Sequence, residues 1–490
     1  MYIVFVYFDF MQGAGGKYNG ASGKYHEGLA SISACLKQRG YRVSLYQITE
    51  KQTAEQYLDT FKTLYADADI VGFSSTSQAF PYVSEFANVL KKAFPDKLMI
   101  CGGVHPSLMP EESLQSPGLD IVCRGEGEYS MLELCERLES GGDITSIEGL
   151  WVKHNNRVYS NPPRPPIRDL DALPFPDRDL FDYEHSVDKQ MDRLVFSGSR
   201  GCPHDCTYCC NHALKKLCPG GTAYVRRKSP DRLIAEIQQA IAQYPPFTYI
   251  YFADDLLLLK KNWSAEFLEK YAASVRKPFA CNCRFELINP ALVDQLKKAG
   301  CWQLQLGLES GSSYIRQEVL NRHQSTEMIL SAGKLIAEKQ IPLLVFSMIG
   351  VPFETPAQAL ETVKMNALLR PTICHLTVFY PFPATELYAL CQKNGLLTPR
   401  HLDSLFEGET TLQLPDFPPN KITFAYRNFQ TFVSQYMTIF SFKQPWRTIF
   451  EKIVDFLWLH PRIYSVVNPA YRAAKKTFRS IRRKLSPKKK

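Results

Sequence analysis

Strand-forming and helix-forming segments alternate through the first 145 residues of this 490-residue sequence. Short β-rich runs occur at 2–8, 41–46, 69–75, 97–103 and 120–124. Amphipathic helical patterns lie between them, for example at 29–38, 80–94 and 129–138. A strand followed by a helix, repeated, predicts an α/β domain with a doubly wound, Rossmann-like parallel sheet over residues 1–145.

Ligands of such sheets bind beyond the carboxyl ends of the strands. The turns that follow the predicted strands are rich in glycine and polar residues. They are the loop 12–28, Ser74-Ser75-Thr76, Gly102-Gly103-Val104-His105-Pro106 and Arg124-Gly125-Glu126-Gly127-Glu128. Because glycine lets the backbone approach a ligand closely, we expect a large cofactor at this edge.

A proline-rich stretch separates this domain from a second strand–helix series. Residues 146–190 contain the runs 161–166 and 173–177, and we expect them to form a stiff linker. Strand candidates then follow at 193–197, 248–252, 279–283, 303–308, 343–349 and 375–380. Six such units predict a partial (β/α)6, TIM-like barrel over 191–395, followed by a helical region at 396–490.

Composition restricts the class of protein. With 45% hydrophobic and 22% charged residues, the sequence is that of a folded soluble protein. It contains no run of about 20 apolar residues that would cross a membrane, and it starts without the basic and apolar segments of a secretory signal. We therefore expect a cytoplasmic protein whose 14 cysteines are thiols or metal ligands, not disulfides.

The sharpest motif is Cys202-Pro203-His204-Asp205-Cys206-Thr207-Tyr208-Cys209, directly after the first strand of the second series. Three thiolates spaced CxxxCxxC can bind three irons of a cubane cluster and leave the fourth iron open. A zinc site would need a fourth ligand, for which Cys210 and Cys218 are candidates. Unligated structural cysteines are disfavoured because the residues between them are polar.

With its aromatic residue before the third cysteine, the motif resembles the signature of the radical S-adenosylmethionine (SAM) superfamily. The resemblance implies a [4Fe–4S] cluster on Cys202, Cys206 and Cys209 that binds SAM. It also implies that polar residues at the barrel's strand ends contact SAM. By position these are Tyr208, Asp254, Asp255, Arg284, Glu309, Ser310, Arg322 and Gly350. The alternatives are a structural ion pair for Glu309 or Arg284, and a cap for Asp254 and Asp255.

A doubly wound domain before such a barrel resembles the cobalamin-binding radical SAM class. This resemblance implies a cobalamin rim formed by Gly102, Gly103, His105, Gly125 and Glu126. None of the ten histidines lies in a D-x-H-x-x-G motif, so we expect no histidine ligand on cobalt and interpret His105 as a turn residue. The methylthiotransferases are a competing resemblance, but the cysteines of the first domain are scattered and Cys35 and Cys135 lie in apolar helical patterns.

The net charge of +9 is a property of the tail. Residues 471–490 hold ten Lys and Arg residues and no acid, which leaves −1 for the remainder. Tyr471, Ala474, Phe478, Ile481 and Leu485 share one face of a predicted basic helix. Two interpretations stand: a peripheral membrane contact through 446–490, or a solvated tail. The scarcity of aromatic residues disfavours nucleic acid.

The resemblance implies a radical enzyme that cleaves SAM reductively to a 5′-deoxyadenosyl radical. We expect it to use cobalamin to methylate an unactivated carbon of a small or lipid-like metabolite, with a reductant such as flavodoxin or ferredoxin. One alternative is a cyclisation, oxidation or rearrangement with the same cofactors. Another is a non-enzymatic module in which cysteines hold a metal for electron transfer.

Overall fold

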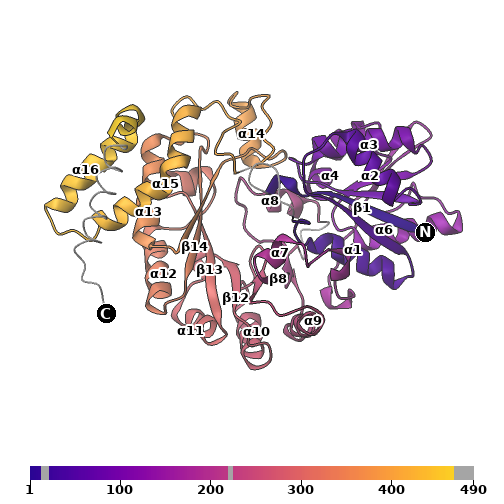
Figure 1. Cartoon of the computed structure of the whole chain (residues 1–490), viewed down its shortest axis with the longest axis horizontal. Helices are drawn as coiled ribbons and strands as arrows, with labels where there is room; N and C mark the ends of the chain where they lie inside the picture. The colour runs from indigo at the N-terminus through magenta and orange to yellow at the C-terminus, as the bar shows by residue number, and fades with distance from the viewer. Residues whose placement is uncertain (13–20, 219–223, 405, 468–490) are drawn as a thin grey trace, which may run out of the picture.

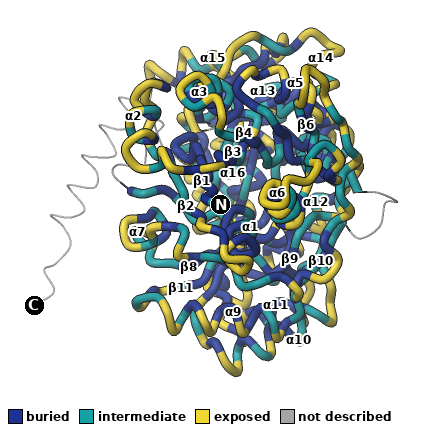
Figure 2. The backbone as a smooth tube through the Cα atoms, turned by 90° about the vertical axis from the view of Figure 1, so that its right-hand side faces the viewer, coloured by how far each residue is buried: buried dark blue, intermediate teal, exposed yellow. Residues whose placement is uncertain are grey.

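The structure is a computed structural model that describes residues 1–12, 21–218, 224–404 and 406–467. Two α/β units lie side by side, and helices from the C-terminal part of the chain cover the far side of the second unit (Figure 1). Buried residues concentrate in the strands and in the helix faces against them, whereas exposed residues lie on the outer turns and helices (Figure 2). The predicted fold class is confirmed.

The first sheet has seven strands in the order β2-β1-β3-β4-β5-β6-β7. Five are parallel, and β6 and β7 pair antiparallel. Their bounds are β1 Tyr2–Phe8, β2 Arg42–Ile48, β3 Ile70–Ser74, β4 Leu98–Gly102, β5 Ile121–Cys123, β6 Leu150–His154 and β7 Arg157–Ser160. The helices are η1 Phe10–Gln12, α1 Glu27–Gln38, α2 Ala54–Leu64, α3 Phe80–Ala93, α4 Val104–Leu108, α5 Pro110–Gln115 and α6 Glu128–Ser140.

Strand β1 shows why this sheet needs helices on both faces. All seven of its residues are buried. Ile3, Phe5 and Tyr7 pack with residues of α1 and α6, whereas Val4, Val6 and Phe8 pack with residues of α2 and α3. Because successive side chains of a strand point to opposite faces, a strand that is apolar throughout is stable only between two helix layers.

The region 146–190 differs from a plain linker. Strands β6 and β7 extend the first sheet beyond residue 145, and η2 (Leu170–Ala172), η3 (Arg178–Leu180) and α7 (Val187–Gln190) follow. The prolines stiffen the chain between these elements, but the chain folds back onto α1. Asp177 accepts from Ser33 and pairs with Lys37, and Leu170 and Leu173 pack on Cys35. Cys35 and Cys135 are buried, as predicted.

The second sheet has six parallel strands in sequence order from β8 to β15, the arrangement of a half-barrel. Its strands are β8 Arg193–Phe196, β11 Tyr249–Phe252, β12 Phe279–Cys283, β13 Cys301–Glu309, β14 Leu343–Ile349 and β15 Ile373–Val378, and β9 Ser199–Arg200 pairs with β10 Arg226–Arg227. Its helices are α8 Cys210–Lys216, α9 Pro230–Gln243, α10 Lys261–Ser274, η5 Phe285–Leu287, α11 Pro290–Lys298, η6 Ile315–Val319, α12 Thr326–Glu338 and α13 Pro356–Leu369.

The C-terminal part contains α14 Glu386–Lys393, α15 Pro419–Ile439 and α16 Trp446–Leu459. Helix α15 packs on α13 and β15, and α16 packs on α13 and α15. Between α14 and α15 the chain returns to the first domain, where Asp403 pairs with Lys51 and accepts from Tyr82. No helix in the described ranges is long and apolar enough to span a bilayer. The predicted basic helix at 471–485 lies outside the described residues.

The turn after β4 shows what its two glycines contribute. Gly103 has a φ of 102°, and a Cβ on it would lie 2.7 Å from the Ser75 carbonyl oxygen and 2.8 Å from the Ser75 nitrogen. A Cβ on Gly102 would meet the Cys123 side chain at an ordinary 3.6 Å. Gly103 is therefore required by the neighbouring loop of the same sheet, independently of any ligand.

We predict that Gly103→Ala lowers the free energy of unfolding of the cofactor-free protein by about 2 kcal/mol, because backbone strain and a backbone collision add together. Gly102→Ala is the matched control and should change it by less than about 0.5 kcal/mol. Thermal and urea unfolding measure both variants. Equal stability of the two would contradict the assignment of Gly103 to the fold.

Candidate functional site

The predicted cluster loop joins β9 to α8, and it is anchored on both sides by hydrogen bonds to backbone carbonyl groups. The Thr207 hydroxyl donates to the Val319 carbonyl at 2.6 Å, and the Asn321 amide donates to the Asp205 carbonyl at 2.7 Å. On the other side, the Leu387 N–H donates to the Thr207 carbonyl. The loop is therefore held between the turn after β13 and the start of α14.

Cys206 is the best-supported ligand candidate in this loop. Its side chain is buried, and Arg284 Nη1 and Arg322 Nη1 lie 3.5 Å and 3.8 Å from its Sγ. Two guanidinium groups beside one sulfur would offset the negative charge of a thiolate-bound cluster. Arg284 also donates to Glu286, which keeps the guanidinium in place. Both predicted arginines thus meet at Cys206.

Cys202 and Cys209 are half-buried, so the loop is open to a cofactor. A hydrogen bond with Cys210 is the main cause that lowers the pKa of Cys209 to about 7, which favours its thiolate. Among the described residues, no three His, Cys, Asp or Glu side chains converge on a single metal ion. A cubane does not require such convergence, because each thiolate binds a different iron. The loop therefore fits the cluster.

Tyr208, Glu309 and Arg322 form one polar group next to the loop. Arg322 Nη1 donates to the Tyr208 hydroxyl at 3.1 Å and lies 3.8 Å from Glu309, and Arg322 Nη2 donates to the Gly307 carbonyl at 2.6 Å. Glu309 has a φ of 61°, at a register shift between β13 and β14. A non-glycine residue in this conformation is strained, as is frequent at ligand sites.

The adjacent aspartates at the end of β11 point in different directions. Asp254 is buried and accepts from the Gly198 N–H and the Ser199 hydroxyl, and burial raises its pKa to about 6. It therefore fixes the chain that leads into the cluster loop. Asp255 is exposed and accepts from the Asn211 amide at 3.1 Å. Only Asp255 is open to a ligand, which corrects the paired assignment.

Two further predicted SAM contacts face the protein interior. The Ser310 hydroxyl is fully buried and meets the Thr362 hydroxyl at 3.4 Å, so it does not line the rim. Gly350 has a φ of 73°, and a Cβ on it would approach Ile422 of α15 at 3.2 Å. Its N–H donates to Glu354 at 2.6 Å. The sequence pattern placed both residues correctly at strand ends but could not give the direction that they face.

A cavity of about 360 Å³ lies where the first sheet meets the second domain, at the carboxyl edge predicted for a cofactor. Its volume is within the range of ligand pockets. Its lining includes Gly102, Gly103, Gly125 and Glu126. A Cβ on Gly125 would meet no atom within 4 Å, so that backbone borders open space. This apolar cavity with glycine backbone at its edge fits part of a large cofactor such as cobalamin.

His105 does not line that cavity. Its ring is buried in α4, stacks on Phe80 at 4.2 Å and bonds to the Ser77 hydroxyl at 3.2 Å. Burial lowers its pKa to about 4, so the imidazole is neutral at physiological pH. The sequence-based interpretation as a turn residue is wrong in detail, because the segment after Gly103 forms a short helix. His105 contributes to packing in that helix.

Partly buried ion pairs join the two domains at the border of this cavity. Arg200, in β9, donates to Glu126 at 2.8 Å and to Glu128 at 2.5 Å. Arg226, in β10, donates to the other oxygen of Glu126 at 2.7 Å. Burial alone would raise the pKa of Glu126, but these two guanidinium groups lower it. The carboxylate predicted for the cobalamin rim is thus held by the second domain.

Lys228 forms a second bridge between the domains, with Glu27 at 3.2 Å and Glu236 at 2.7 Å. Neither bridge is visible in the sequence. The partners of Arg200 and Lys228 in the first domain are 72 to 201 positions away, and no local pattern pairs them. Arg200 nonetheless lies two positions before Cys202. This proximity to the cysteine motif was the one local signal in the sequence that Arg200 belongs to the site.

We predict that Arg200→Ala lowers the free energy of unfolding by about 3 kcal/mol, because it leaves the buried Glu128 and the half-buried Glu126 with fewer cations. Adding Glu128→Gln to this variant should restore part of the loss. Arg400→Ala breaks the exposed pair with Glu409 and serves as the control, with an expected change below about 1 kcal/mol. Urea unfolding measures all three, and equal losses for Arg200→Ala and Arg400→Ala would overturn the assignment.

We also predict that the stability of the protein depends on pH through Glu354. Burial raises the pKa of this acid to about 8, although hydrogen bonds from the backbone N–H groups of Gly350 and Val351 act in the opposite direction. Between pH 4.5 and 8 the unfolded chain binds fewer protons at this position than the folded chain, so stability falls as the pH rises. Glu354→Gln should reduce this fall by about 3 kcal/mol. Free energies of unfolding measured at pH 5 and pH 8 test this prediction, and Glu338→Gln, at an exposed position, is the control. An equal loss of stability between the two pH values in Glu354→Gln and in the unmodified protein would refute it.

Two regions of the chain match known families. Residues 23–135 match the B12 binding domain, and residues 196–365 match the radical SAM superfamily. The chain is 27% identical over 412 residues to an uncharacterized methyltransferase of Pyrococcus horikoshii, a match that covers 84% of this chain and 87% of that protein.

Other relatives have more specific names. The chain is 24% identical to the anaerobic magnesium-protoporphyrin IX monomethyl ester cyclase of Rubrivivax gelatinosus, over 74% of this chain and 65% of that longer protein. It is 25% identical to the hopanoid C-3 methylase of Methylococcus capsulatus, over 73% of this chain and 67% of that protein.

Among solved structures, the cobalamin-dependent S-adenosylmethionine radical enzyme OxsB superposes with a TM-score of 0.68 at 15% identity, over 93% of this chain and 72% of that chain. That likeness shows a shared fold. The chain therefore has a radical SAM domain, preceded by a B12-binding domain.

Proposed function

We propose that this radical SAM enzyme methylates an unactivated carbon of a small or lipid-like metabolite. The observation that carries the proposal is the direct ionic contact between the cavity border and the strand that leads into the cluster loop, through Arg200, Glu126 and Glu128. A substrate held between the domains would be near both cofactor sites. The hopanoid and porphyrin-ester names of two relatives support an extended, hydrophobic substrate.

When bound, the cluster and SAM supply a radical that removes a substrate hydrogen, and cobalamin supplies the methyl group. The chain's own residues hold these groups. Cys202, Cys206 and Cys209 would ligate the cluster, and Arg284 and Arg322, which lie beside the Cys206 sulfur, would offset its negative charge.

The rim residues suit the zwitterionic end of SAM. Arg322 offers a guanidinium for a carboxylate, and Glu309 and Asp255 offer carboxylates for an ammonium group. Burial raises the pKa of Glu309, and the charge of Arg322 opposes this. The Tyr208 hydroxyl holds Arg322 in place. Reduction of the cluster requires an external one-electron donor such as flavodoxin or ferredoxin.

A second candidate function is a cyclisation or another radical outcome without methyl transfer. The similarity to the magnesium-protoporphyrin IX monomethyl ester cyclase supports this second candidate. The two outcomes share every residue discussed above, because they differ only in what the substrate radical meets next. Product analysis separates the two candidate functions.

The proposed function also includes a peripheral membrane contact through residues 446–490.

We predict that Cys206→Ala abolishes the iron–sulfur absorption of the reconstituted protein and the formation of 5′-deoxyadenosine from SAM and dithionite. Cys218→Ala is the matched control: it removes a thiol close in sequence to the loop and should keep the cluster bands and more than about half of the activity. S-adenosylhomocysteine formed in proportion to product supports methyl transfer. Turnover without it would replace methyl transfer by the second candidate, and full activity of Cys206→Ala would reject both.

A further inference from the structure

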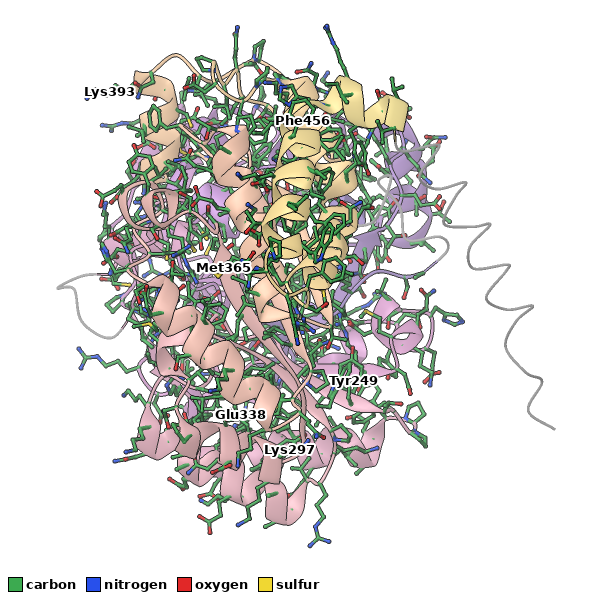
Figure 3. All side chains as sticks on the ribbon, turned by 90° about the vertical axis from the view of Figure 1, so that its left-hand side faces the viewer. Tyr249, Lys297, Glu338, Met365, Lys393 and Phe456 are labelled. Atoms are coloured by element: carbon green, nitrogen blue, oxygen red, sulfur yellow. The ribbon has the colours of Figure 1, made fainter. Side chains whose placement is uncertain are left out.

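Helix α16 carries an exposed apolar face. Its residues recur at steps of three and four along the helix, and with Phe442 just before it they form what we call the α16 patch: Phe442, Trp446, Ile449, Phe450, Ile453 and Phe456. Trp446 is 60% exposed and Ile453 is 49% exposed. The helix lies at the end of the molecule opposite the first domain (Figure 1), the end that faces the viewer in Figure 3, where Phe456 is labelled.

The opposite face of α16 is docked, so the patch has a defined direction. Val454 and Trp458 are buried, and the Trp458 indole N–H donates to the Pro356 carbonyl at 2.8 Å. Asp455 pairs with Lys364 of α13 at 2.8 Å and accepts from Tyr436 of α15. These contacts fix the rotation of the helix about its axis. The apolar side chains therefore point away from the protein as a consequence of specific packing.

The patch is continuous. The rings of Phe442 and Phe450 are 5.4 Å apart between centroids, and those of Trp446 and Phe450 are 6.4 Å apart. Clustered exposed aromatic and aliphatic groups are uncommon on a soluble surface and mark an interaction site. Tryptophan and phenylalanine on one face of a helix, with cations beside them, are typical of helices that lie in a membrane interface.

The charges around the patch indicate which kind of surface it can bind. The two acids of α16, Glu451 and Asp455, are paired with Arg447 and Lys364. Lys443, Lys452 and Arg462 are exposed and lie within a few positions of patch residues in the sequence. The chain that follows carries ten further cations and no acid in residues 471–490. A surface of one sign repels a second copy of itself and attracts an anionic surface.

We propose that α16 docks the protein on an anionic lipid surface, with the α16 patch in the headgroup region and the flanking cations on lipid phosphates. This deepens the peripheral contact included in the proposed function. The docking proposal rests on the proposed function only for its biological purpose, which is to bring the enzyme to a lipid-like substrate. The docking itself requires neither the cluster nor turnover.

Flotation of the full-length protein with vesicles of 70% phosphatidylcholine and 30% phosphatidylglycerol tests the docking. Ile453→Glu and Phe450→Glu should each weaken binding to the vesicles about tenfold or more. Each replaces an apolar side chain that would be buried in the lipid by an anion. Leu64→Glu, at an equally exposed apolar position of α2, is the matched control and should bind normally. Binding should fall in 0.5 M NaCl, where charge attraction is screened.

A depth measurement separates insertion of the patch from attraction of the basic tail alone. Brominated lipids should quench tryptophan fluorescence, and Trp446→Phe should remove most of the quenching, because Trp446 is the most exposed residue of the patch. Equal flotation of Ile453→Glu, Leu64→Glu and the unmodified protein would overturn the proposal. The proposal would also be overturned if the protein formed a dimer without lipid and Ile453→Glu dissociated that dimer, because the patch would then be an interface between two copies of the chain. Formation of 5′-deoxyadenosine from SAM and dithionite without lipid, unchanged in Ile453→Glu, separates this result from a failure of the proposed chemistry.

Discussion

The contact of Arg200 with Glu126 and Glu128 is the interaction on which the arrangement of the two domains depends. It joins the turn after β5, which borders the cofactor cavity, to the strand that enters the cluster loop two residues later. Three charges are brought partly out of water together, and each compensates another. Because these ion pairs are directional and Glu128 is buried, they hold the two proposed cofactor sites at a defined separation, whereas an apolar contact would let the two surfaces slide.

The site on the second domain is built on the same principle of compensated charge. Arg322 serves Cys206, Tyr208 and Glu309 at once, and Arg284 adds a second cation beside Cys206. These residues come from three places in the chain: the loop after β9 (Cys206 and Tyr208), the end of β12 (Arg284), and the end of β13 with the segment that follows it (Glu309 and Arg322). A half-barrel of parallel strands brings such ends to one rim, so a site can be assembled from single residues far apart in the sequence.

Much of the fold could be predicted because its determinants are local. The apolar runs of β1, β12 and β14 give strand boundaries that match the structure. The spacing of Cys202, Cys206 and Cys209 carries the cluster chemistry in eight residues. Asp254 and Ser310 show the limit: the pattern puts both at strand ends, yet Asp254 turns inward to Ser199 and Ser310 to Thr362. Which way a polar side chain points depends on neighbours that arrive from elsewhere in the chain.

The sequence by itself determined two α/β units, the cluster motif and the glycine-rich edge of the first sheet, because periodicity and spacing are properties of a continuous chain. Only the tertiary structure decided that Gly103 is required by Ser75, that Glu126 belongs to an ion pair with Arg200 and Arg226, and that α16 turns its apolar face outward. The physical reason is the same in each case. Burial and charge pairing are set by the three-dimensional surroundings of a residue, and those surroundings come from segments up to 201 positions away.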